Sequence, residues 1–117
     1  MPETVLIVDD HEPFRARARA LLEADGFEVV GEAADGESAL EASHRLRPAV
    51  MLLDVHLPGL DGFAVAERLA AEADSPMVVL VSSRGAETYR RRLQASPARG
   101  FIAKAELSGE CLASLLS

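Results

Sequence analysis

The sequence is short of the features that mark a disulfide-bonded, membrane-bound or nucleic-acid-binding protein. It contains one cysteine, Cys111, which excludes a disulfide within the chain and fits a reducing compartment. It has no apolar run long enough to cross a bilayer and no basic segment followed by an apolar leader. Basic residues number 12 against 19 acidic ones, and the net charge of −7 argues against direct nucleic-acid binding by this segment. We therefore expect a cytoplasmic protein with no membrane contact.

What the sequence does contain is an alternation of apolar runs with segments of helical periodicity. Its 117 residues, 49% of them apolar, are enough for one domain, which we predict to span residues 1–117. The apolar runs predict strands at 4–8, 27–33, 49–53, 77–81 and 101–103. Pro13 suits the first turn of a helix, whose buried face is expected to carry Phe14, Ala18, Leu21 and Leu22. Residues 86–95 are predicted to form a later helix.

Five strands that alternate with helices predict an α/β fold with a parallel sheet covered on both faces. The strand at 27–33 is more polar than the others and is expected near an edge of the sheet. In such folds, ligands bind at the carboxyl ends of the strands, beside the point where the strand order reverses. The residues that follow each strand are therefore the first candidates for a functional site.

Charged and hydroxyl side chains follow four of the five predicted strands. They are Asp9 and Asp10, then Asp54, then Ser82 and Ser83, and finally Lys104. Each one alone has an ordinary explanation, as a helix cap or a surface residue. Because all of them are expected at the same edge of the sheet, together they predict one chemical site assembled from separate segments.

The charges of these residues indicate the chemistry of the site. Three carboxylates crowded together repel one another, and a divalent cation together with Lys104 would neutralise them. Aspartates without histidine or cysteine ligands favour Mg²⁺, with Mn²⁺ as a second option. An aspartate can act as a nucleophile that forms an aspartyl phosphate. The site therefore suits phosphoryl transfer to Asp54, with Lys104 and Ser82 contacting the phosphoryl oxygens.

Two other motifs compete for the segment around Asp54. Residues 54–59 match the D-x-H-x-x-G motif of cobalamin-binding domains, in which the histidine ligates cobalt. In that family the motif follows the first strand and is accompanied by a Gly-Gly pair, which this chain lacks. A phosphatase of the haloacid dehalogenase type requires D-x-D after the first strand, where this chain has the adjacent pair Asp9-Asp10.

Taken together, "LIVDDHEPFR", "LLDVHLPGLDG", "VLVSS" and "GFIAKAEL" resemble the receiver domain of two-component response regulators, over the whole chain. The resemblance implies a flavodoxin-like (βα)5 fold with strand order 2-1-3-4-5. It also implies roles for individual residues: Asp54 as phosphoacceptor; Asp9, Asp10, Asp54 and the backbone carbonyl of His56 as Mg²⁺ ligands; Lys104 as phosphate contact; Ser82 and Phe101 as switch residues. The ring of His56 is then expected to face solvent.

The resemblance further implies a signalling switch phosphorylated by a sensor histidine kinase, which catalyses only its own phosphorylation and dephosphorylation and is otherwise no enzyme. Activation is expected to reshape the face formed by helix 4, strand 5 and helix 5, where a homodimer would form and where Arg90 to Arg92 would contribute. Ala105 follows the lysine where many relatives have a proline after a cis peptide bond, so the sequence leaves open whether the Lys104–Ala105 bond is cis or trans. In this departure the chain resembles receivers with LuxR-type helix-turn-helix outputs. Two alternatives stay open: a free-standing receiver acting by protein contacts, and an interaction module independent of phosphorylation.

Overall fold

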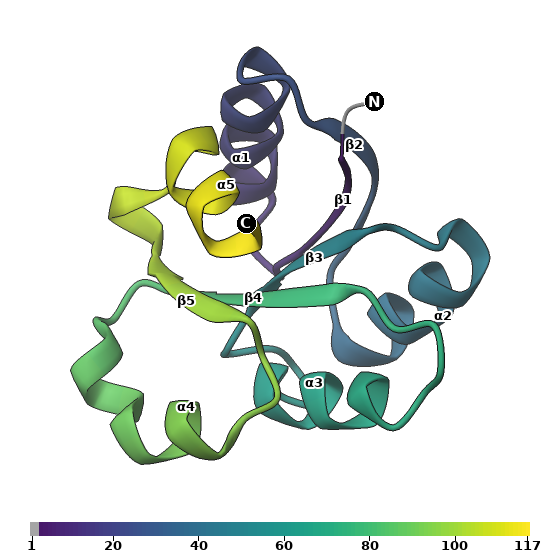
Figure 1. Ribbon diagram of the computed structural model, residues 1–117, viewed down its shortest axis with the longest axis vertical. Helices are drawn as coiled ribbons and strands as arrows, with labels where there is room; N and C mark the ends of the chain where they lie inside the picture. The colour runs from purple at the N-terminus through teal and green to yellow at the C-terminus, as the bar shows by residue number, and fades with distance from the viewer. Residues whose placement is uncertain (1–2) are drawn as a thin grey trace.

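The computed structural model describes residues 3–117 as a parallel sheet between two layers of helices (Figure 1). The strands are β1 (Thr4–Val8), β2 (Glu28–Ala33), β3 (Val50–Asp54), β4 (Met77–Ser82) and β5 (Gly100–Ala103). The helices are α1 (Glu12–Ala24), α2 (Gly36–Leu46), α3 (Gly62–Ala70), α4 (Arg90–Ala95) and α5 (Gly109–Leu116), with 3-10 turns η1 (Ala86–Tyr89) and η2 (Lys104–Glu106). The strand order is β2-β1-β3-β4-β5, which confirms the predicted flavodoxin-like topology with β2 at an edge.

Each face of the sheet has its own apolar core, because successive side chains of a strand point to opposite faces. On one face α1 and α5 pack on the sheet, and on the other α2, α3 and α4 do so (Figure 1). The central strand β3 shows the alternation most clearly. Its Met51 and Leu53 belong to the core under α2 and α3, whereas Val50 and Leu52 belong to the core under α1 and α5. All four side chains are fully buried.

The predicted boundaries differ from the observed ones in small ways. β3 ends at Asp54 rather than before it, and β4 includes Ser82. The helix predicted at 86–95 divides into the 3-10 turn η1 and the short helix α4. The prediction that Leu21 lies on the buried face of α1 is wrong: its side chain is 37% exposed, because Leu22 and Ala18 already fill the space against the sheet.

The loop between β3 and α3 brings the backbone of α3 very close to Asp54. Gly59 has a φ of 73°, a left-handed conformation that glycine adopts without strain. Asp61 then caps α3 by accepting a hydrogen bond from the amide of Ala64 at 2.9 Å. A β-carbon at Gly62 would collide with the carbonyl oxygen of Asp54, so only glycine fits there. The loop sequence thus fixes the position of Asp54.

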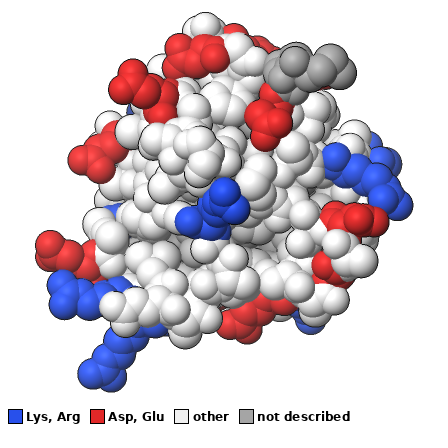
Figure 2. All heavy atoms as spheres, viewed as in Figure 1, with Lys and Arg blue, Asp and Glu red and all other residues white. Residues whose placement is uncertain are grey.

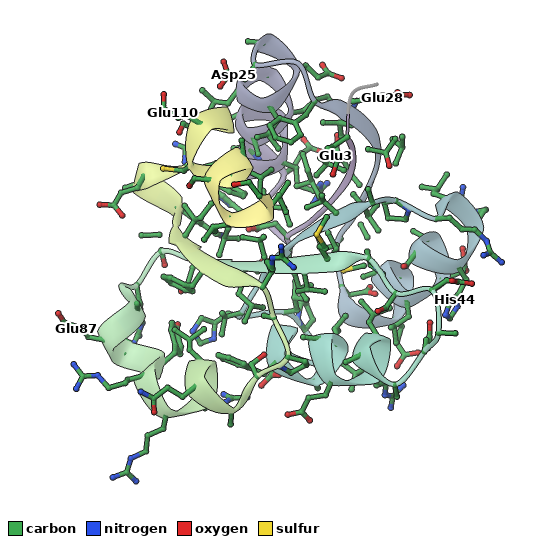
Figure 3. All side chains as sticks on the ribbon, viewed as in Figure 1. Glu3, Asp25, Glu28, His44, Glu87 and Glu110 are labelled. Atoms are coloured by element: carbon green, nitrogen blue, oxygen red, sulfur yellow. The ribbon has the colours of Figure 1, made fainter. Side chains whose placement is uncertain are left out.

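A second junction joins parts of the chain that are far apart in sequence. Asp25, just after α1, accepts a hydrogen bond from the amide of Gly109 at 2.9 Å and ties α1 to the first turn of α5. Figure 3 shows Asp25 and Glu110 at this junction, between the ends of the two helices. The peptide bonds of the described residues are all trans, including Lys104–Ala105. Within residues 3–117, no helix combines the length and apolar character needed to cross a membrane.

Candidate functional site

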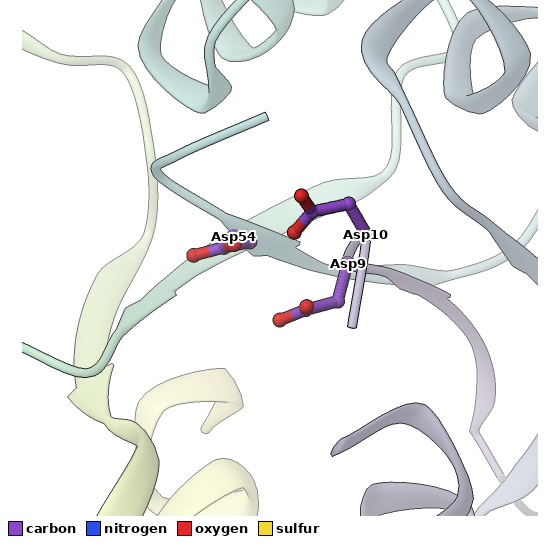
Figure 4. A group of neighbouring side chains, drawn as sticks. All are labelled: Asp9, Asp10 and Asp54. Atoms are coloured by element: carbon purple, nitrogen blue, oxygen red, sulfur yellow. The ribbon is translucent and has the colours of Figure 1, made fainter. Parts of the chain in front are cut away.

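Three aspartates converge at the carboxyl ends of the central strands β1 and β3 (Figure 4). Asp9 and Asp10 directly follow β1, and Asp54 is the last residue of β3. One carboxylate oxygen from each lies within 4.8 Å of the others. Asp9 and Asp54 are buried, with 0% and 4% exposure, whereas Asp10 is exposed. The fold therefore brings together the three carboxylates that the sequence placed at separate strand ends.

Lys104 reaches into this cluster from the end of β5. Its Nζ lies 2.5 Å from Asp9 Oδ2 and 3.6 Å from Asp54 Oδ2, and it also sits 4.5 Å from the centre of the Phe14 ring. Asp9 Oδ1 accepts a hydrogen bond from the amide of His11 at 2.8 Å. Asp9 Oδ2, in contrast, is a buried oxygen that forms an ion pair but no well-aligned hydrogen bond. Lys104 thus pairs with two of the three carboxylates in the cluster.

The charge imbalance shows in the pKa of Asp54. Burial raises this pKa, and the neighbouring Asp9 raises it further. Lys104 and the backbone amide of His56 act in the opposite direction, and the resulting pKa is about 6. A buried carboxylate with so high a pKa lacks sufficient positive charge around it.

The donor atoms of the cluster fit a hard divalent cation. The three aspartates offer carboxylate oxygens, and the described residues within the cluster include no histidine or cysteine that would favour zinc or copper. The buried oxygen of Asp9 without a well-aligned partner, and the raised pKa of Asp54, both indicate room for a further positive charge. Mg²⁺ therefore matches this set of residues.

The predicted switch residues, Ser82 in β4 and Phe101 in β5, are connected by a residue that was not identified from the sequence. Ser82 is fully buried at the end of β4, and its Oγ lies 2.9 Å from the hydroxyl of Tyr89. The ring of Tyr89 also packs near Phe101, with ring centres 6.1 Å apart. His56 is exposed as expected, but its Nε2 contacts the same tyrosine hydroxyl at 2.6 Å. A single tyrosine in a chain with few aromatic residues was the signal available in the sequence.

The predicted arginine surface divides into two parts. Arg90 and Arg91 are exposed, and Figure 2 shows basic side chains projecting beside α4, at the lower left of the view. Arg92 is exposed too, but its side chain turns toward α3, where it pairs with Asp61 at 2.8 Å and lies 4.2 Å from the centre of the Phe63 ring. Partial burial raises the pKa of Asp61, but hydrogen bonds from Arg92 and from backbone amides outweigh it and lower this pKa overall. Arg92 therefore anchors α4 to the α3 cap.

A doubly wound parallel sheet with an acidic cluster and a lysine at its strand ends defines the class of flavodoxin-like receiver proteins. The family model for the response regulator receiver domain matches residues 5–115, and the chain belongs to this family.

Three relatives illustrate what this chain is similar to. A transcriptional regulator of Pseudomonas aeruginosa is 41% identical over 109 residues, which are 92% of this chain and 52% of that protein. A protein-glutamate methylesterase/protein-glutamine glutaminase of Myxococcus xanthus is 49% identical over 88 residues, which are 74% of this chain and 25% of that protein. The signal receiver domain of the response regulator NarL from Mycobacterium tuberculosis has a TM-score of 0.83 and 34% identity, with 99% of this chain and 98% of that chain covered.

The chain spans about half the length of the first of these relatives and a quarter of the second. The names of these two relatives state different activities.

Proposed function

We propose that this receiver domain accepts a phosphoryl group on Asp54 from the phosphohistidine of a sensor histidine kinase, in the presence of Mg²⁺. The observation that carries the proposal is the convergence of Asp9, Asp10 and Asp54 within 4.8 Å, with Lys104 beside the two buried carboxylates. An ion-pair network serving stability alone would balance its charges. Here the carboxylates exceed the cations, and Asp54 has a pKa of about 6.

Each residue has a chemical role in the transfer. A carboxylate oxygen of Asp54 attacks phosphorus, so that an O–P bond forms as the N–P bond of the phosphohistidine breaks and the imidazole leaves. Lys104 offsets charge on the equatorial phosphoryl oxygens, and the hydroxyl of Ser82 donates a hydrogen bond to one of them. Asp9, Asp10, Asp54 and the backbone carbonyl of His56 would hold Mg²⁺, which when bound supplies positive charge beside the phosphoryl oxygens. Mn²⁺ offers the same chemistry.

The phosphorylated state then differs from the resting state through contacts with the phosphoryl oxygens. Movement of Ser82 and Phe101 would reshape the face formed by α4, β5 and α5. We place a homodimer contact on this face, with Arg90 and Arg91 in it and Arg92 outside it because of its ion pair with Asp61. The domain catalyses only its own phosphorylation and dephosphorylation, in the cytoplasm, as part of a longer transcriptional regulator.

The first experiment measures covalent modification of the protein. Wild type and Asp54→Asn are incubated with acetyl phosphate, with Mg²⁺ or with a chelator, and their intact masses are compared. We expect one added phosphoryl group on the wild type in Mg²⁺, and none on the variant or in the chelator. Equal modification of the variant would refute the role of Asp54. An unmodified wild type that still binds a partner protein would favour the phosphorylation-independent interaction module.

The second experiment tests the dimer face. Arg90→Glu with Arg91→Glu should abolish association of the phosphorylated protein in analytical ultracentrifugation, and Arg92→Glu should affect it less because Arg92 is bound to Asp61 within the chain. Association that is unchanged in the double variant would refute the placement of the interface.

A further inference from the structure

The single tyrosine of the chain connects the end of β4 to the loop after β3. Tyr89 is 6% exposed and lies at the end of η1, directly before α4. Its hydroxyl is 2.9 Å from Ser82 Oγ and 2.6 Å from His56 Nε2. No general feature of the sheet requires these two contacts. They join a buried serine, an exposed histidine and the start of α4.

The proton count determines the direction of these hydrogen bonds. Ser82 Oγ already accepts a hydrogen bond from the amide of Arg84 at 3.1 Å. If Tyr89 also donated to Ser82, the serine proton would have no acceptor among the hydrogen bonds of residues 3–117, which is costly in a buried group. The satisfied arrangement runs from the Ser82 O–H to the Tyr89 oxygen, and from the Tyr89 O–H to His56 Nε2. In the resting state the Ser82 hydroxyl therefore donates its one hydrogen bond to the Tyr89 oxygen.

We propose that Tyr89 is a positioning residue that holds the switch hydroxyl of Ser82 in the resting state and releases it on phosphorylation. This inference rests on the proposed phosphorylation of Asp54. Ser82 has one proton, so it cannot donate to a phosphoryl oxygen on Asp54 and to Tyr89 at once. Activation must end the donation from Ser82 to Tyr89, and this hydrogen bond biases the domain toward its resting state.

The same tyrosine carries the change toward α4 and β5. Its ring lies between Phe63 of α3 and Phe101 of β5, with centre-to-centre distances of 5.9 and 6.1 Å. Once Ser82 no longer donates to the Tyr89 hydroxyl, only packing and the hydrogen bond to His56 hold Tyr89. Movement of Tyr89 then changes the surroundings of Phe101 and the first turn of α4.

The first test uses Tyr89 as its own probe, because the chain contains no tryptophan and no other tyrosine. Binding of beryllofluoride with Mg²⁺ is followed by fluorine NMR, and tyrosine fluorescence is recorded on the same samples. We expect the emission to change as beryllofluoride binds, because the phenol oxygen loses the Ser82 hydroxyl as a hydrogen-bond donor. Asp54→Asn should show neither signal. Binding without any change in emission would overturn the role of Tyr89 alone, whereas no binding to wild type would overturn both this role and the proposed function.

The second test removes the hydroxyl and keeps the ring. In Tyr89→Phe, loss of the Ser82–Tyr89 bond weakens only the resting state, so beryllofluoride should bind about 3- to 10-fold more tightly in Mg²⁺. A residue that merely supports the fold would leave the affinity unchanged or weaken it, and either result would overturn the proposal.

Two further variants distinguish the effect of losing the Tyr89 hydroxyl from the effect of loosening α4 in general. In a Ser82→Ala background, Tyr89→Phe should change the affinity by less than twofold, because the hydrogen bond is already absent. Arg92→Gln breaks a different anchor of α4 and should leave the affinity near that of wild type. Equal tightening by Arg92→Gln, or a full effect of Tyr89→Phe without Ser82, would overturn the proposal.

Discussion

Replacing Asp54 with asparagine should make the metal-free protein more stable at neutral pH, although it removes the proposed phosphoacceptor. Asp54 is 4% exposed, and burial together with the charge of Asp9 raises its pKa from 3.8 to about 6. The folded state therefore disfavours the charged carboxylate relative to the unfolded chain. Asparagine has nearly the same shape and stays neutral at every pH.

The sign and size of the effect follow from this pKa. Since the pKa of Asp54 is higher in the folded state, its favourable contribution is fully present below 3.8 and is lost as the pH rises through about 6. Each tenfold change in proton affinity is worth about 1.4 kcal/mol, so we expect the variant to gain about 1–3 kcal/mol above neutral pH. The two proteins should be similar in stability at acidic pH.

The assay is urea unfolding followed by circular dichroism over a pH series, in chelator and in Mg²⁺. Mg²⁺ should stabilise the wild type more than the variant and so reduce or reverse the difference. Asp10→Asn serves as the matched control. Because Asp10 is exposed, this variant should gain less stability than Asp54→Asn. Equal stability of wild type and Asp54→Asn at all pH values in chelator, or a difference that is largest in acid, would refute the reasoning.

Two further predictions concern the surroundings of the site. Arg92→Gln should lower the free energy of unfolding by about 0.2–1 kcal/mol, as surface ion pairs do. This loss should be present above the ordinary pKa of Asp61 and fade as the pH falls through its lowered value, so a constant loss in urea titrations over that range would contradict the ion pair. Gly62→Ala should cost about 1–3 kcal/mol because its β-carbon would meet the Asp54 carbonyl. Gly85→Ala is the control, since its β-carbon meets open space, and an equal loss in both variants would contradict the account.

The sequence predicted the fold well because the periodicity of this chain is unusually clear. Fully apolar runs such as residues 49–53 identify buried parallel strands, and chain connectivity then limits where their carboxyl ends meet. For the same reason the cluster of Asp9, Asp10 and Asp54 could be anticipated without coordinates. The error at Leu21 arose because helical spacing defines the buried stripe of a helix but not its edge, and Ala18 and Leu22 already fill the space against the sheet.

The contacts of side chains between helices were beyond the reach of the sequence. Tyr89 lies seven residues after Ser82 and is far from His56 in the chain, so no local pattern pairs the three residues. In the sequence Arg92 is one of three consecutive arginines, but in the structure the packing of α4 against α3 brings its side chain to Asp61. Such contacts depend on how two elements pack together, which the periodicity of each element does not define.

The most direct measurement of the central claim is to locate the phosphoryl group chemically. The protein is phosphorylated by a phosphohistidine donor in Mg²⁺, reduced with borohydride and digested, and the peptide containing the modified residue is sequenced by mass spectrometry. An aspartyl phosphate is reduced to homoserine, so the account predicts homoserine at position 54 and unchanged aspartate at positions 9 and 10. Homoserine at position 9 or 10, or a phosphoryl group that resists reduction because it sits on Ser82, would contradict it.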